Sequence, residues 1–130
     1  MNGPSEELRE HVALTLDEVT DEEQLEEILG TIEEELSSDL GGGPRDEQEE
    51  MAAIDAWAGL ASYAVGRFYA PASPWPFRKG GWDKRAPERL RRIADQLRGP
   101  LERVARALGA VTWSISVGFP WGVSISVSWP

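Results

Sequence analysis

Apolar and hydroxyl side chains alternate along the C-terminal segment 111–129. One phase holds serine and threonine, and the other holds large apolar residues: Val111, Trp113, Ile115, Val117, Phe119, Val123, Ile125, Val127 and Trp129. A period of two with β-branched and aromatic residues predicts β-strands that have one polar and one apolar face. We therefore predict an antiparallel β-hairpin over residues 111–129.

The two strands must place their apolar phases on the same side, and this requirement selects the loop between them. A two-residue loop would set apolar residues opposite serines, whereas the three-residue loop Pro120-Trp121-Gly122 sets apolar opposite apolar. Proline suits the second position of a type I turn, and glycine suits the left-handed position that follows. The predicted pairs are Phe119 with Val123, Val117 with Ile125, Ile115 with Val127, and Trp113 with Trp129.

Upstream of the hairpin, apolar residues recur every three or four positions, which predicts helices. The predicted segments are two acidic helices within 1–43, a central helix over 44–70 and a basic helix over 85–109. Gly30 in the second helix costs about 1 kcal/mol relative to alanine, which indicates either a packing reason or a weak point. Gly99-Pro100 predicts a kink or a break in the basic helix, because the proline nitrogen cannot donate a hydrogen bond.

The segment 71–84 between the central and basic helices contains three prolines and two glycines, so we predict an irregular loop there. It also contains three aromatic residues, Trp75, Phe77 and Trp82. Together, the elements predict one α+β domain over 1–130, with three or four helices packed on a C-terminal two-stranded antiparallel hairpin.

Charge is divided unevenly along the chain, whose net charge is −10. Residues 1–55 carry 19 acidic and 2 basic side chains, whereas residues 56–130 carry 4 acidic and 11 basic ones. The acidic half would repel phosphates, which disfavours nucleic acid as a partner. The basic helix is predicted to have a solvated arginine face, and Glu88, Asp95 and Glu102 lie at helical spacing to pair with some of these arginines. The arginines are Arg85, Arg89, Arg91, Arg92, Arg98, Arg103 and Arg106.

The absence of cysteine excludes disulfides and thiolate chemistry. The sequence has no leader pattern and no apolar run long enough to span a membrane, so we expect a cytoplasmic protein. Basic residues are almost all arginine, 11 against 2 lysines, which suggests a bacterial source.

No motif predicts a cofactor or a metal site. His11 is the only histidine, and no nucleophile-elbow sequence accompanies it, so we assign it a surface or capping role. The glutamate clusters at Glu22 to Glu27 and Glu33 to Glu35 lack the spacing of a calcium loop, and they predict a solvated face. An enzyme would have to use carboxylates, such as Glu23 with Asp55, although no spacing favours a specific pair.

The apolar face of the hairpin needs a cover, and three covers are compatible with the sequence: the protein's own helices, a partner chain, or lipid. A partner could also add to an open strand edge, because the strands contain no lysine or proline. The first hypothesis for function is a non-catalytic interaction or regulatory module that binds another protein chain as a homo-oligomer or a hetero-complex. A small membrane-active effector and a small carboxylate enzyme are the alternatives. The predicted partner-binding residues are the aromatic ones of the loop and the hairpin: Trp75, Phe77, Trp82, Trp113, Phe119, Trp121 and Trp129.

Overall fold

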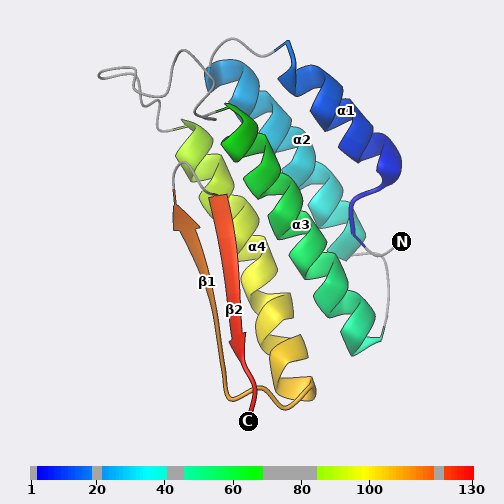
Figure 1. Ribbon diagram of the computed structural model, residues 1–130, viewed down its shortest axis with the longest axis vertical. Coiled ribbons are helices and arrows are strands. Elements are labelled where there is room, and N and C mark those ends of the chain that lie inside the picture. The colour runs from blue at the N-terminus through cyan, green and yellow to red at the C-terminus, as the bar shows by residue number, and fades with distance from the viewer. Residues whose placement is uncertain (1–2, 19–21, 41–45, 69–84, 119–121) are drawn as a thin grey trace.

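Four helices precede a two-stranded antiparallel hairpin in the computed structural model, which describes residues 3–18, 22–40, 46–68, 85–118 and 122–130. The elements are α1 (Glu6–Leu16), α2 (Glu22–Leu40), α3 (Glu47–Phe68), α4 (Arg85–Ala107), β1 (Thr112–Gly118) and β2 (Gly122–Ser128). The hairpin lies alongside α4, on the side of the molecule opposite α1 (Figure 1). The predicted α+β arrangement is therefore confirmed.

Local sequence signals explain where the helices begin. Ser5 caps α1, because its side-chain oxygen accepts a hydrogen bond of 3.1 Å from the backbone nitrogen of Leu8. Acidic residues fill the first turn of α3, where they meet the positive end of the helix dipole.

The helix α3 is central, as its wide apolar face predicts, because it packs against α1, α2, α4 and β2. Trp57 of α3 is almost fully buried, and its indole nitrogen donates a hydrogen bond of 2.7 Å to Oδ2 of Asp39 at the end of α2. The same oxygen accepts a hydrogen bond of 3.1 Å from the backbone nitrogen of Gly3. One carboxylate thus joins the N-terminal segment, α2 and α3.

Of the two outcomes predicted at Gly99-Pro100, a kink or a break, the structure excludes the break. The helix α4 runs continuously from Arg85 to Ala107 with Pro100 inside it. Leu97, Leu101 and Val104, on both sides of the proline, are almost fully buried in the core. Burial of these side chains offsets the loss of one helical hydrogen bond at Pro100.

The hairpin has the predicted apolar phase, but its predicted register is wrong by two residues. Val117 pairs with Val123, Ile115 with Ile125, and Trp113 with Val127. The strands are joined through 119–121, outside the described residues, and not through Pro120-Trp121-Gly122, since Gly118 and Gly122 face each other as the last pair. A shift of two residues keeps every side chain on its face, so the alternating pattern cannot distinguish the two registers.

Candidate functional site

A contact between α3 and the start of β2 explains the observed register. Gly122 has a φ of +96°, and a Cβ built on it would lie 2.6 Å from the Cα of Ser62 in α3. Only glycine permits this close approach of two backbones. The predicted register would place Gly122 in the loop and would lose this contact.

The same contact fixes which backbone groups of the hairpin face outward. The Oγ of Ser62 accepts a hydrogen bond of 3.0 Å from the nitrogen of Val123 and donates one of 3.0 Å to its carbonyl. Both backbone groups of Val123 therefore point away from β1 and toward α3. Val123 is the first outward-facing residue of β2, and Ser62 of α3 binds both of its backbone groups.

Outward and inward backbone groups alternate along an antiparallel strand, so the orientation of Val123 determines the orientation of the rest. Val117 pairs with Val123 and must also direct its N–H and C=O outward. Trp113 and Ile115 share this phase on β1. Among the described residues, none forms a hydrogen bond to the outward groups of these three β1 residues. The outer edge of β1 is therefore open within the described part of the chain.

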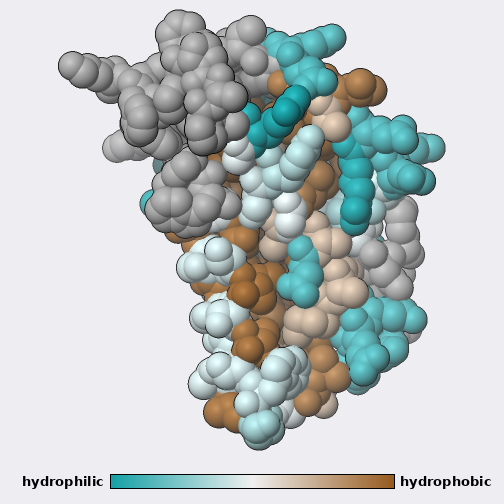
Figure 2. Space-filling model, viewed as in Figure 1, coloured by the Kyte–Doolittle hydropathy of each residue, from teal (hydrophilic) through white to brown (hydrophobic). Residues whose placement is uncertain are grey.

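The apolar phase of the hairpin faces the protein's own helices but is only partly buried. Val123 is buried, whereas Ile115, Val117, Ile125 and Val127 are half-buried where they pack against the core. Beyond the paired residues, Val111 is 61% and Trp129 is 52% exposed. Over the hairpin, Figure 2 shows pale and brown atoms, while strongly hydrophilic teal atoms lie mainly over the helices.

The exposed side of α4 borders this uncharged sheet with several arginines. Arg106 lies over the indole of Trp113, with its Cζ 5.6 Å from the ring centroid, and it also pairs with Glu102 at 2.9 Å. Arg98 pairs with Asp95 at 2.8 Å, and both are more than half exposed. These two pairs confirm the predicted solvated face, and exposed ion pairs of this kind contribute little to stability.

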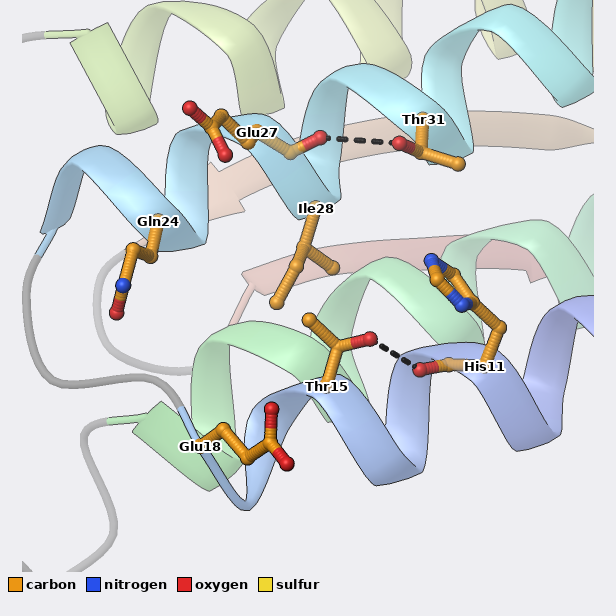
Figure 3. Close-up of a pocket in the computed structure, with 7 residues that line it drawn as sticks. All are labelled: His11, Thr15, Glu18, Gln24, Glu27, Ile28 and Thr31. Carbon is orange, nitrogen blue, oxygen red and sulfur yellow. Dashed lines mark hydrogen bonds between the residues drawn. The ribbon is translucent and has the colours of Figure 1, made fainter.

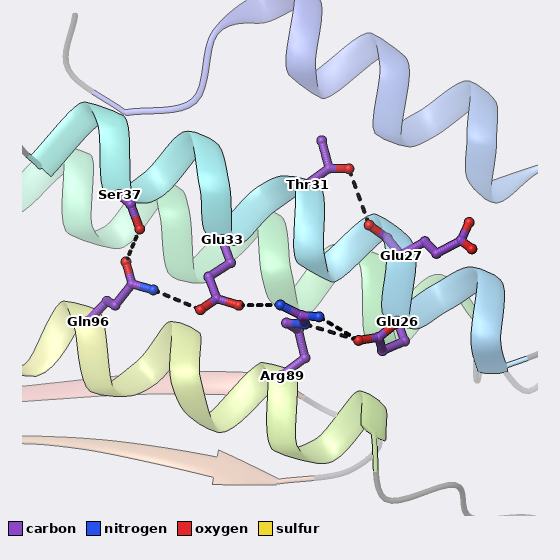
Figure 4. A network of polar contacts seen from close by, with 7 residues as sticks. All are labelled: Glu26, Glu27, Thr31, Glu33, Ser37, Arg89 and Gln96. Atoms are coloured by element: carbon purple, nitrogen blue, oxygen red, sulfur yellow. Dashed lines mark hydrogen bonds and ion pairs between the residues drawn. The ribbon is translucent and has the colours of Figure 1, made fainter.

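Arg89 departs from that prediction, because it lies between α4 and α2 and not on a solvated face (Figure 4). Its guanidinium contacts Glu26 at 2.6 Å and Glu33 at 2.9 Å, and the side chains of these glutamates are only 19% and 16% exposed. The pKa of Arg89 is raised above its ordinary value, mainly by the hydrogen bond to Glu33 and secondly by the hydrogen bond to Glu26. Glu26 and Glu33, which belong to the glutamate clusters predicted to be solvated, therefore form an interhelical contact.

Gly30 lies beside this contact, between Glu26 and Glu33 on α2. A Cβ built on it would lie 3.6 Å from the Cζ of Arg89, which is an ordinary van der Waals distance. The contact with Arg89 therefore does not require a glycine at this position. No sequence signal pairs Arg89 with residues so far away, since any arginine of the basic helix has the same local pattern.

A depression between α1 and α2 contains His11 (Figure 3). His11 is exposed, and its backbone carbonyl accepts a hydrogen bond of 2.6 Å from the hydroxyl of Thr15. Glu18 and Glu27 also line the depression. Within the described ranges, no three histidine, aspartate or glutamate side chains lie close enough together to hold a metal ion.

The carboxylates considered for an enzyme lie on different helices. Glu23 is exposed on α2, and Asp55 lies on α3, where partial burial raises the pKa of its carboxyl group above the ordinary value. No contact among the described residues joins the two carboxylates. A second depression, between α1 and α3, is lined mainly by small or apolar residues and Arg9; its lining is Arg9, Ala13, Ala56, Gly59, Leu60 and Tyr63.

Of the predicted partner-binding residues, the described part of the chain contains two. Trp113 is half-buried on β1 and Trp129 follows β2, but they are not cross-strand partners as predicted, because Trp113 pairs with Val127. The others lie outside the described residues: Trp75, Phe77, Trp82, Phe119 and Trp121. The sequence suggests an open strand edge, and the structure adds that the outward backbone groups of β1 form such an edge within the described residues.

None of the helices in the described ranges has the length and apolar character that crossing a membrane requires. The chain matches no protein-family model, and searches of the curated proteins and of the solved structures gave no match.

Proposed function

We propose that this protein is a non-catalytic interaction module that binds another protein chain through its hairpin and the adjoining surface of α4. The observation that carries the proposal is the edge of β1, where outward backbone groups adjoin partly exposed apolar side chains. An open strand edge is a template for another chain, and proteins that do not use it protect it with charges or prolines. The strand segments 112–118 and 122–128 contain neither.

A photo-crosslinking experiment in cells that naturally contain the protein tests this proposal. A benzophenone amino acid replaces Ser116, which is exposed on β1, or, as the matched control, Glu34, which is exposed on α2. We expect position 116 to give one abundant crosslinked species that is absent from position 34. Failure of position 116 to give any crosslink, while the purified protein is monomeric, would contradict the proposal.

A further inference from the structure

The edge of β1 can be assigned to a class of partner because the helices above the hairpin limit what fits there. The helix α4 packs mainly on β1, and α3 packs on β2. The helix α4 therefore covers mainly β1, and α3 meets the outer edge of β2 through Ser62. Neighbouring helix axes need about 8–10 Å, whereas neighbouring strands lie about 4.8 Å apart.

The position of α4 disfavours a second copy of the chain as the occupant of the edge. If two copies joined their β1 strands edge to edge, these strands would lie about 4.8 Å apart, with the two α4 helices on the same face of the sheet. Helices that lie mainly over these strands would crowd each other, because packed helices need about 8 Å between their axes. A lone extended segment brings no helix with it, so it fits beneath the outer flank of α4.

The charges of α4 indicate what that segment carries. Its exposed arginines outnumber its exposed acids, and Arg103 pairs with Glu50 of α3; the exposed arginines are Arg91, Arg92, Arg98, Arg103 and Arg106. Arg106 lies at the Trp113 end of β1, where it contacts the indole ring. A strand added antiparallel to β1 would end beside Trp113, so acidic residues that follow this strand would meet Arg106.

We propose that the outer edge of β1 binds a single extended segment of another protein as a third, antiparallel strand, and that acidic residues follow this segment. The inference rests on the proposed function and names its partner class. The bound segment alternates apolar and small polar residues, since cross-strand neighbours share a face and β1 has this alternation. Main-chain hydrogen bonds to Trp113, Ile115 and Val117 hold it.

The probe is a synthetic peptide with the sequence of residues 111–118, followed by glutamates, and the control peptide ends in lysines. Pairing Ile115 of the peptide with Ile115 of the protein places apolar residues opposite apolar residues and serines opposite serines. We expect saturable binding of the glutamate peptide to the full chain by calorimetry. We expect the lysine peptide to bind at least about tenfold more weakly, a difference of about 1.4 kcal/mol.

Two proline variants locate the binding edge. Ile115 and Ile125 are cross-strand partners with outward N–H groups on opposite edges, so Ile115→Pro and Ile125→Pro lose the same side chain and the same kind of donor. We expect Ile115→Pro to weaken peptide binding at least about tenfold and Ile125→Pro to change it less than about threefold. Equal loss of binding in both variants would overturn the assignment to β1.

Amide hydrogen exchange on the unmodified protein gives an answer even if the variants fail to fold. In the free protein, the amides of Trp113, Ile115 and Val117 should exchange faster than those of Ser114 and Ser116, and the glutamate peptide should slow them. Three results would each overturn the inference. They are unchanged amide exchange at saturating peptide, equal affinity for the glutamate and lysine peptides, and a dimer of the protein that Ile115→Pro dissociates. Crosslinks from position 116 would in that case still support the proposed function, so the two failures are distinguishable.

Discussion

Replacing Gly122 by alanine tests the contact on which the register and the open edge both depend. The new Cβ would lie 2.6 Å from Cα, 2.7 Å from Oγ and 2.9 Å from Cβ of Ser62. The nearest of these atoms belongs to the backbone of α3, so a change of side-chain rotamer cannot relieve the clash. The strand must move away from α3 instead.

Gly109 provides the matched control. Its φ of +84° is close to the +96° of Gly122, but nothing lies within 4 Å of a Cβ built on it. Alanine at either position bears the strain of a left-handed backbone, about 1–2 kcal/mol. Only Gly122→Ala also breaks the two hydrogen bonds between Ser62 and Val123, which contribute about 0.5–1.5 kcal/mol each.

The expected losses of unfolding free energy are therefore about 1–2 kcal/mol for Gly109→Ala and about 2–5 kcal/mol for Gly122→Ala. Urea unfolding, followed by circular dichroism at 222 nm and by tryptophan fluorescence, measures both losses. The fluorescence change should begin at lower urea concentration in Gly122→Ala if the hairpin detaches first. Two variants that lose the same stability within about 0.5 kcal/mol would refute the close approach of β2 to α3.

Three other substitutions and one control variant test the helices. Arg89→Met leaves Glu26 and Glu33 without their shared cation and should lower the free energy of unfolding by about 1–3 kcal/mol. The control Arg98→Met, at an exposed ion pair, should change it by less than about 0.5 kcal/mol, and equal effects in urea unfolding would contradict the interhelical role of Arg89. Pro100→Ala restores a helical donor and should raise the melting temperature through a gain of up to about 3 kcal/mol, and a loss would mean that the proline ring packs favourably. Folding raises the pKa of Asp55 above its ordinary value of 3.8, so the ionised carboxylate destabilises the folded state as pH rises through and above this value. Asp55→Asn should therefore be more stable than the native chain at pH 7 and should lose this advantage near pH 3. A stability gain that does not depend on pH would contradict desolvation as the cause.

The sequence predicts the elements of this fold well because their signals are local. Ser5 caps α1, apolar spacing identifies the central helix, and the alternation after Val111 identifies both strands and their buried phase. At Pro100 the sequence allows either a kink or a break, because tertiary packing and not the local signal decides whether the helix continues. Leu97 and Leu101 are buried on either side of the proline, and this burial keeps α4 in one piece.

The candidate site could not be predicted to the same extent, because distant residues define it. Ser62 is an ordinary polar residue in a helix when it is seen in sequence, and Val123 is one of several β-branched residues of the hairpin. Only the fold places the hydroxyl of Ser62 against both backbone groups of Val123. Arg89 is a similar case, since its choice of Glu26 and Glu33 over nearer acids depends on how α2 and α4 pack.

Within the described residues, the direction of the outward backbone groups of β1 follows from this one long-range contact. In the register predicted from the sequence, Val123 would pair with Phe119. The contact with Ser62 would then be lost, and α3 would not determine which backbone groups of the hairpin point outward. With Val123 held by Ser62, the odd-numbered residues of β1 must direct their backbone groups away from β2. At Trp113, Ile115 and Val117, hydrogen bonding to another chain would depend on this strand geometry and not on side-chain identity, so the predicted aromatic residues do not by themselves define the edge.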